Sequence, residues 1–287
     1  IVGMAFLPAG RVLFAPCGWM LDSYRFLCEV SLKIPGAQRI TGKPAHMRIF
    51  WYYLGLGVFL LAIYACARRN EKHKDCRETA DLCVSRRKKR LQGIVFSCFI
   101  AFLLLFLLFP QKKSFEIDFL DVGQGDGIYL CTGGGTSMFI DGGSTDVKQV
   151  GKYRILPFLK AKGVSEISYW FVSHTDTDHV SGLKEVLVSG YRVEYLVFAK
   201  AVEKEAKTKE LAELARSHGT KVLYMQAGDT VRNKRAAMSC LYPKASDKAE
   251  DVNDLCLVLQ FEEGDIRALF GGDISTCLLY TSDAADD

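Results

Sequence analysis

The sequence predicts a protein of the α/β class: a two-sheet sandwich covered by helices, preceded by two transmembrane helices. Three observations predict this organisation. Two long uncharged runs lie in the first 111 residues. Short strand-like segments follow, first joined by tight turns and then alternating with helix-like segments. One of these strands runs directly into a group of His and Asp residues, which indicates a functional site.

The uncharged runs cover residues 49–67 and 91–111. At 1.5 Å per residue, each is long enough to cross a bilayer core about 30 Å thick. The alternative is a pair of buried core helices, but neither run carries a charge over its 19 or 21 positions. We therefore expect transmembrane helices at 49–67 and 94–110 in a multi-pass protein of the cell membrane.

The loop between these runs, residues 68–93, predicts their orientation. Residues 68–90 carry 10 Lys or Arg and 4 Asp or Glu, and short basic loops stay on the cytoplasmic side. The chain after residue 110 is then extracytoplasmic. The alternative interpretation of the loop is a nucleic-acid patch or a localisation signal. Residues 112–276 carry 21 Lys or Arg against 24 Asp or Glu, so net charge alone does not predict nucleic-acid binding there.

Residues 1–48 are expected to be the end of a membrane region. Within them, residues 18–34 mix apolar and polar positions, as an amphipathic helix on a membrane surface does. A short soluble helix packed on another part of the protein is an equal alternative. The chain starts at Ile1 without a signal-peptide pattern, so we expect an internal fragment. Its 10 cysteines form no C-x-x-C pair, and no disulfide is predicted.

The folded domain is expected over residues 115–276. Apolar or alternating segments predict strands, and segments with helical spacing predict helices. Gly-rich turns separate the first three strands. The predicted strands are 115–122, 127–132, 137–140, 167–172, 193–199, 220–225, 236–243, 254–263 and 265–273, and the predicted helices are 146–162 with a break or start at Pro157, one beginning at 180, and 203–219.

Residues 172–183, VSHTDTDHVSGL, carry the chemistry of the predicted site. In a tight turn between strand and helix, His174 and Asp176 can reach one ion, while Asp178 and His179 reach a second beside it. Mixed imidazole and carboxylate ligands suit Zn²⁺ or Mn²⁺. Two such divalent metal ions can activate water and stabilise an in-line displacement on phosphorus. The alternative is a solvated Asp-rich turn, which the rarity of this pattern disfavours.

The motifs taken together resemble a known family. LDVGQGDGIYL, FIDGG, SHTDTDHVSGL and a late strand ending in LFGGD occur in this order. The order resembles the metallo-β-lactamase-fold domain of ComEC/Rec2-type DNA internalisation proteins, and the resemblance extends to the membrane part. It implies a metallo-β-lactamase-like αββα sandwich, incomplete in this chain, that follows a polytopic competence region.

The resemblance also implies a role in DNA uptake during natural transformation. Such proteins form an inner channel, and their metal-dependent phosphodiesterase or nuclease domain is thought to degrade one strand while the other enters. The implied partners are single-stranded DNA, membrane lipid and components of the competence machinery; the oligomeric state stays open. Two other functions remain open: another membrane-tethered metallo-hydrolase of the same fold, and a non-catalytic gating domain of the channel.

The family's site can be carried over to numbered residues. The implied metal ligands are His174, Asp176, Asp178, His179 and, as the residue bridging two ions, Asp273. Asp121, Gln124 and Asp126 match the family's D-V-G-Q-G-D, and Asp141 matches its D-G-G. Asp126 and Asp141 are expected to line or brace the site, and with Asp178 they are the candidate catalytic residues. For the first motif a structural interpretation is preferred, in which the glycines form turns and Asp126 caps one.

The chain departs from the family pattern after Asp273. A His-His-Gly-Ser segment, which supplies another ligand in the family, is absent, and residues 277–287 resemble a non-native tail. We therefore expect a truncated domain. Cys256 stands where the family often has Ser, and His218, beside Gly219 at a helix end, is interpreted as structural.

Overall fold

The computed structural model describes residues 7–34, 36, 39–72, 82–109, 113–233, 236–248 and 252–274. The predicted tail at 277–287 and the middle of the basic loop, 73–81, lie outside these residues. The chain divides into two compact units, Ile1–Ile40 and Thr41–Asp287. Each unit is described by itself.

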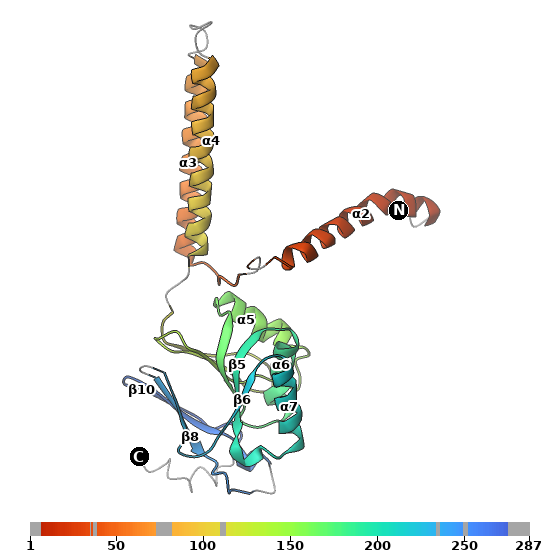
Figure 1. The fold of residues 1–287 in the computed structure, drawn as a ribbon, viewed down its shortest axis with the longest axis vertical. Helices are drawn as coiled ribbons and strands as arrows, with labels where there is room; N and C mark the ends of the chain where they lie inside the picture. Colours follow the sequence, from red (N-terminus) through yellow and green to blue (C-terminus); the bar gives the residue numbers. More distant parts are fainter. Residues whose placement is uncertain are drawn as a thin grey trace. The chain divides into compact units, whose positions relative to one another are not determined.

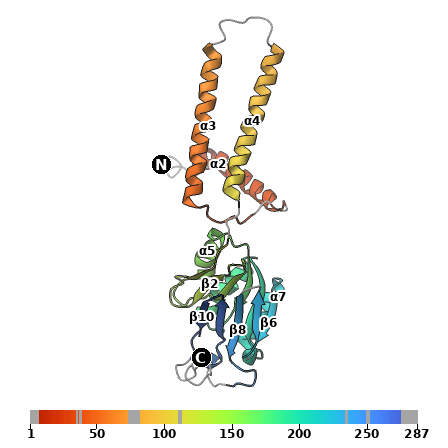
Figure 2. The same cartoon turned by 90° about the vertical axis from the view of Figure 1, so that its left-hand side faces the viewer.

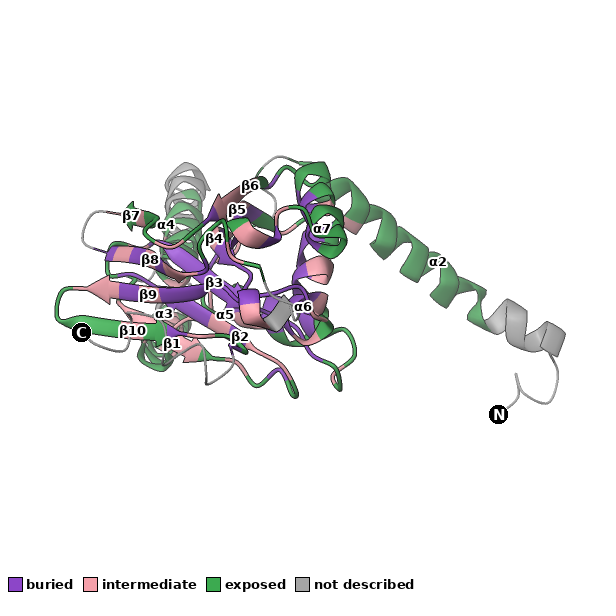
Figure 3. Ribbon diagram, turned by 90° about the horizontal axis from the view of Figure 1, so that it is seen from below, coloured by how far each residue is buried: buried purple, intermediate pink, exposed green. Residues whose placement is uncertain are grey.

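The first unit contains one described helix, α2 (Leu7–Leu32), shown in red in Figure 1. The predicted segment 18–34 lies almost wholly within it, but the helix begins earlier and continues through Pro16. Its described side chains are mainly exposed, including Trp19 and Tyr24, as the green colour in Figure 3 shows. An apolar helix surface of this kind fits a lipid surface or another protein, and both alternatives from the sequence stay open.

The second unit begins with a helical hairpin of α3 (His46–Lys72) and α4 (Leu82–Leu108), which run antiparallel to each other (Figure 2). Aromatic packing joins the two helices. The rings of Phe59 and Phe99 stack with their centroids 4.1 Å apart. At the open end of the hairpin, Arg48 donates a hydrogen bond to the carbonyl of Phe109 at 2.5 Å.

One helix in the described part of the chain, His46–Ala65, is long and apolar enough to cross a membrane. The apolar part of α4, Gly93–Leu108, is shorter. The predicted second span at 94–110 is therefore not confirmed by length and composition. The physical reason is that the first turns of α4 hold the basic run RRKKR, so the 27-residue helix is only partly apolar.

The folded domain contains two β-sheets. The first has six strands in the order β1-β2-β3-β4-β5-β6. Strands β1 to β3 pair antiparallel, and β3 to β6 pair parallel. The strands are β1 (Glu116–Phe119), β2 (Gly127–Cys131), β3 (Ser137–Asp141), β4 (Glu166–Phe171), β5 (Arg192–Ala199) and β6 (Lys221–Met225).

The second sheet is antiparallel, in the order β10-β9-β8-β7. Its strands are β7 (Thr230–Asn233), β8 (Ala236–Tyr242), β9 (Val258–Glu263) and β10 (Ile266–Phe270). The last three were predicted. Strand β7 was missed because TVRN is short and has only one large apolar residue, so its pattern could not be separated from a loop.

Helices connect the parallel strands of the first sheet. They are the π-helix η2 (Gly151–Ile155) leading into α5 (Leu156–Ala161), α6 (Thr177–Val188), and α7 (Ala206–Ser217), with short 3-10 turns at η3 (Lys200–Val202) and η4 (Val252–Leu255). The predicted change near Pro157 is confirmed, since this residue lies in the first turn of α5. Pro is favoured in the first turn of a helix because its fixed φ angle already suits the helix.

The strands alternate their side chains between two cores, as a period of two requires. Tyr129 and Trp170 face α5, α6 and α7 in one buried cluster. Leu130 and Phe171 face the second sheet in another cluster, where they meet residues such as Phe261. Figure 3 shows these central strands as mostly buried. The folded domain therefore has three layers: helices, the six-stranded sheet and the four-stranded sheet.

The loops after β3 and β4 leave the same edge of the first sheet, because these two strands are parallel. The second sheet meets this edge at two places. Just before β9, the N–H of Leu257 donates to the carbonyl of Ser173, and in the turn after β10, Gly272 approaches Ser173 closely. Ligands of open α/β sheets bind at such carboxyl ends. The predicted cluster lies at this edge.

Candidate metal centre

Two buried histidines form the centre of the site. His174 follows β4, His179 lies in the first turns of α6, and their ring centroids are 4.0 Å apart. Both are at most 3% exposed. Asp141, at the end of β3, is equally buried and places its Oδ2 3.1 Å from Nδ1 of His179. A carboxylate that binds one ring nitrogen fixes the tautomer and leaves Nε2 available as a metal ligand.

Asp141 is itself held in place by its backbone and neighbours. Its φ angle is 58°, which is unusual for a residue other than glycine. Its Oδ1 accepts a hydrogen bond from the N–H of Ser173 at 2.7 Å, and its carbonyl accepts one from the indole of Trp170 at 2.5 Å. Strained residues of this kind persist where the surrounding structure over-determines them.

Three carboxylates lie around the two imidazoles: Asp176 and Asp178 are partly buried, and Asp273 is exposed. Oδ2 of Asp273 lies 3.3 Å from Nε2 of His179 and 4.0 Å from Nε2 of His174. Oδ2 of Asp176 lies 3.9 Å from Nε2 of His174. Asp178 offers an oxygen within 4.8 Å of ligand atoms of both histidines. These five carboxyl and imidazole groups thus converge from the β4–α6 loop, from the first turn of α6 and from the turn after β10.

A second group forms around the other side of His179. Asp126, Asp141 and His179 each place one possible ligand atom within 4.8 Å of the others. The main chain brings Asp126 there, because its N–H donates to the carbonyl of Asp178 at 3.3 Å and its carbonyl accepts from Gly143 at 3.2 Å. His179 is common to both groups, so the structure brings together seven predicted site residues: Asp126, Asp141, His174, Asp176, Asp178, His179 and Asp273.

The glycine at position 125 permits this approach of the Asp126 loop. A Cβ at Gly125 would lie 2.4 Å from the carbonyl oxygen of Asp178 and 2.6 Å from that of Gly143, and its φ angle is 147°. The preferred interpretation of this motif, glycines for backbone geometry, agrees with these contacts. Asp126 differs from that interpretation, since its half-buried carboxyl joins the cluster.

Two residues of the same motif lie away from the cluster. Asp121 is exposed and forms an ion pair with Arg154 at 3.0 Å. The side chain of Gln124 is exposed, while its N–H donates to Asp146 at 2.8 Å. Both residues therefore shape the loop that carries Asp126.

The environment shifts the titration of the central groups in opposite directions. Burial, aided by the neighbouring His179, lowers the pKa of His174. Burial also opposes a charge on His179, but the hydrogen bond and charge of Asp141, with Asp273 and Asp126, raise its pKa to about 9. Burial and the charge of Asp141 raise the pKa of Asp126. A site that collects several carboxylates around two imidazoles favours a cation at its centre.

The distances fit a divalent metal. Around a tetrahedral ion with bonds near 2.1 Å, neighbouring ligand atoms lie about 3.4 Å apart. The separation of 3.3 Å between His179 and Asp273 matches this value, and the 3.9 and 4.0 Å separations from His174 to Asp176 and Asp273 are close to it. The donor set of imidazole nitrogens and carboxylate oxygens suits Zn²⁺, Mn²⁺ or Fe²⁺.

Two contributors were missed in the sequence. The Oγ of Ser173 lies 3.1 Å from Nδ1 of His174 and 3.4 Å from Nδ1 of His179, so it links the two rings. Lys207, from α7, donates to Oδ1 of Asp176 at 2.8 Å, and this hydrogen bond lowers the pKa of Asp176. Ser173 could have been found from its place next to His174. No sequence pattern pointed to Lys207, because it lies on an amphipathic helix whose charged side chains are normally exposed to solvent.

The structural interpretation of His218 is confirmed: it caps the end of α7, and its ring contacts the carbonyl of Leu214 at 2.9 Å. Six cysteines with described side chains are free: Cys17, Cys28, Cys98, Cys131, Cys240 and Cys256.

The layers, the sheet order and the ligand-bearing strand ends define a metallo-β-lactamase-like α/β fold with a candidate metal centre. Comparison with known proteins identifies relatives. The chain is 28% identical over 209 residues to ComE operon protein 3 of Bacillus subtilis, which covers 67% of this chain and 27% of the relative. It is 31% identical over 106 residues to Recombination protein 2 of Haemophilus influenzae, which covers 36% of this chain and 13% of the relative.

These two homologues confirm the resemblance to ComEC/Rec2-type proteins. The chain spans about a quarter of the length of the first relative and less of the second. No protein-family model matches the chain. Among solved structures, the metallo-β-lactamase fold protein YhfI from Bacillus subtilis is similar, with a TM-score of 0.37, 12% identity, and coverage of 52% of this chain and 55% of YhfI.

Proposed function

We propose that this chain is part of a DNA-uptake protein and that its folded domain is a metal-dependent phosphodiesterase acting on one DNA strand. The observation that carries the proposal is the convergence of two buried imidazoles and several carboxylates at one sheet edge, in a homologue of ComE operon protein 3 and Recombination protein 2. A mixed nitrogen and oxygen site of this kind serves phosphoryl transfer when divalent metals occupy it.

In this proposal, His174, Asp176, Asp178, His179 and Asp273 would hold two divalent ions, Zn²⁺ or Mn²⁺. When bound, such ions supply Lewis acidity and lower the pKa of water. The residues of the chain do the positioning. Asp141 fixes the tautomer of His179, Ser173 links the two rings, and the half-buried carboxyl of Asp126, whose pKa is raised, is placed to exchange a proton beside the cluster.

We also propose that both helices of the hairpin cross the membrane. The helix α3 qualifies by itself, and α4 packs against it along apolar surfaces. Arg90, which precedes the apolar part of α4, is exposed and can extend toward the headgroups, which lengthens the span that a short apolar segment covers. The basic loop would then be cytoplasmic and the metal domain extracytoplasmic. An alkaline phosphatase fusion after residue 113 should be active in cells, and one after residue 76 inactive; the reverse pattern would refute this orientation.

The enzymatic proposal is tested with the full chain purified in detergent. We expect bound Zn²⁺ or Mn²⁺ by elemental analysis, and cleavage of an end-labelled single-stranded oligonucleotide that EDTA abolishes. Asp178→Asn and His174→Ala should lose both properties. Asp121→Asn is the matched control, because it removes a carboxylate of the neighbouring motif that lies outside the cluster, and it should behave like the unmodified chain.

The possible outcomes separate the alternatives. Bound metal without cleavage of DNA, but with cleavage of a lactam or thioester, would favour another hydrolase of the same fold. Metal content near zero would favour a non-catalytic gating domain.

A further inference from the structure

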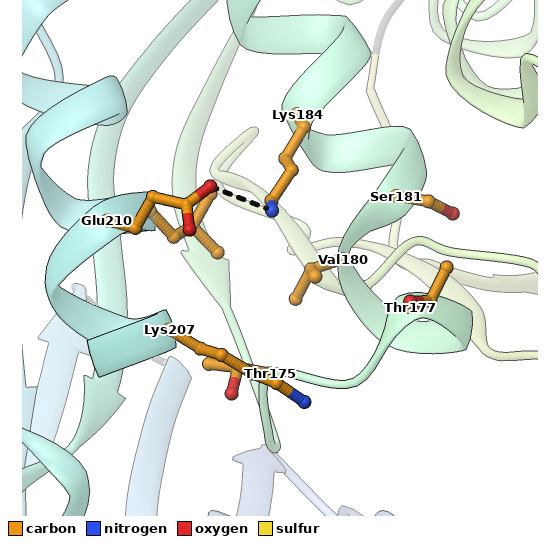
Figure 4. A pocket seen from close by; sticks show the side chains of 8 residues that line it. Thr175, Thr177, Val180, Ser181, Lys184, Lys207 and Glu210 are labelled. Carbon is orange, nitrogen blue, oxygen red and sulfur yellow. Dashed lines mark hydrogen bonds and ion pairs between the residues drawn. The ribbon is translucent and has the colours of Figure 1, made fainter. Parts of the chain in front are cut away.

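A pocket of about 260 Å³ lies between α6 and α7, and Figure 4 shows the side chains that line it. Its walls come from the β4–α6 loop and from the facing sides of the two helices. The lining residues are Thr175, Thr177, Val180, Ser181, Lys184, Lys207, Glu210 and Leu211. None of the predicted site residues lines it, so the pocket is a separate feature of the same edge.

The pocket and the cluster share one loop and are joined by one hydrogen bond. Thr175 stands between His174 and Asp176 in the chain, so the loop that carries the imidazole also forms the pocket wall. Lys207 reaches across from α7 and donates to Oδ1 of Asp176, whose Oδ2 faces His174 at 3.9 Å. A ligand in the pocket would therefore be separated from the candidate metal ligand Asp176 by the side chain of Lys207 alone.

The lining matches a phosphate group. Lys184 and Lys207 bring ammonium groups from two different helices, and Thr175 and Thr177 add hydroxyl groups. The only acidic member of the lining, Glu210, is paired with Lys184 at 3.4 Å, and both side chains are substantially exposed, so the pair is weak and easily exchanged. Lysine binds phosphate as a point charge, and hydroxyls donate to its oxygens.

The lining also has two apolar members, Val180 and Leu211, but its charged members, Lys184, Lys207 and Glu210, leave an excess of one positive charge. The position and the charge thus favour a backbone contact over recognition of a base. Backbone contacts position a nucleic acid without reading its sequence.

We propose that this pocket binds a phosphate of single-stranded DNA next to the phosphate at the metal centre. Lys184 and Lys207 neutralise its charge and fix the register of the strand over the cluster. The proposal rests on the proposed phosphodiesterase function for the identity of the ligand, whereas the pocket itself rests on geometry. Lys207 acts as a positioning residue, because it contacts both the pocket and Asp176.

The test measures binding apart from cleavage. The full chain in detergent is titrated into a fluorescent single-stranded oligonucleotide in EDTA, and anisotropy is followed at several salt concentrations. Lys184→Gln is the main variant, since it leaves Asp176 untouched. Lys209→Gln is the control, because it removes the same charge from α7, the helix that carries Lys207, at a position outside the pocket lining. A Lys184→Gln, Lys207→Gln double variant completes the series.

We expect Lys184→Gln to raise Kd roughly fivefold and to lower the salt slope by about 0.7, the value for one lost contact on a single strand. Lys209→Gln should stay within about twofold of the unmodified chain. Equal effects of Lys184→Gln and Lys209→Gln, or no binding by the unmodified chain, would overturn the proposal. So would binding of phosphatidylglycerol vesicles that depends on Lys184 while oligonucleotide binding does not.

Failure of this proposal is distinguishable from failure of the enzymatic one. Lysine-dependent binding without metal-dependent cleavage supports the pocket and refutes the phosphodiesterase. Cleavage that persists with unchanged affinity in the double variant refutes the pocket and leaves the phosphodiesterase standing.

Discussion

Gly125 tests whether the loop that carries Asp126 is packed as described. In Gly125→Ala, the new methyl would meet the carbonyl oxygens of Asp178 and Gly143 at 2.4 and 2.6 Å, at a φ angle of 147°. Backbone strain contributes about 1 kcal/mol and the steric conflict about 2 kcal/mol, so we expect a loss of about 3 kcal/mol in the free energy of unfolding. For a domain of this size, the melting temperature should fall by roughly 6–12 °C.

Two other glycines separate these contributions. Gly190→Ala carries strain alone, because its φ angle is 75° and a Cβ there meets nothing within 4 Å. Gly143→Ala carries the conflict alone, with a Cβ 2.4 Å from the backbone of Asp178 and no positive φ angle. The expected losses are about 1 and 2 kcal/mol, and the effect in Gly125→Ala should approach their sum.

The assay is thermal unfolding of the full chain in detergent, followed by the fluorescence of the buried Trp170. Trp19 and Trp51 are exposed on helices, so replacing both by Phe in every variant isolates the signal. If Gly190→Ala costs as much as Gly125→Ala, close packing does not explain Gly125. If neither Gly125→Ala nor Gly143→Ala lowers the melting temperature, the loop does not pack on α6 in this way.

Four further predictions follow from other contacts. Asp141→Asn should weaken metal affinity about 10- to 100-fold in competition with a chromogenic chelator, because it no longer fixes His179, whereas Asp121→Asn should not. EDTA should lower the melting temperature, and the free energy of unfolding should fall by about 2.7 kcal/mol if metal was present at 100 times its Kd. Added Zn²⁺ or Mn²⁺ should restore both values, and no change on adding EDTA would argue against bound metal. Burial opposes the charge of Lys162, but hydrogen bonds to Asp118 and Glu116 raise its pKa, so the stabilisation that it gives is fully present below the unfolded pKa of about 10.4 and is lost only above it. Lys162→Gln should therefore lower the free energy of unfolding by under about 1 kcal/mol, equally at pH 6 and pH 9. A loss that differs between these two pH values would contradict the assignment. Burial raises the pKa of the Cys256 thiol to about 12. A maleimide at pH 7.5 should therefore label the exposed Cys17 and should not label Cys256 until the domain unfolds. Labelling of Cys256 in the folded chain would show that this side chain is not buried.

Most of the fold could be predicted because its elements have strong local patterns. Strands β4 and β5 are nearly continuous apolar runs, as buried parallel strands are, and α7 ends at a glycine. The early start of α2 could not be predicted, because Pro16 normally argues for a boundary. Whether an apolar segment spans the membrane also could not be predicted from that segment alone, because the helix α4 combines a basic first half with an apolar second half.

In the candidate site too, some residues could be predicted from local sequence, whereas others depend on tertiary contacts. The residues of one short motif, such as His174 and His179, could be placed together from spacing alone. Asp126 and Asp141 were located by resemblance, but their roles depend on tertiary contacts: a main-chain bond to Asp178 for the first and a bond to His179 for the second. Lys207 is 31 residues from its partner Asp176, a separation that no local pattern reveals.

The site takes ligands from both sheets, and this has a consequence for how the protein is made. The six-stranded sheet ends at Met225, so all of its strands are synthesised before those of the second sheet. His174 and His179 are then already synthesised, but Asp273 emerges later, after β10. His179 and Asp273 would hold a metal ion together, and their shared ligation would tie the second sheet to the first.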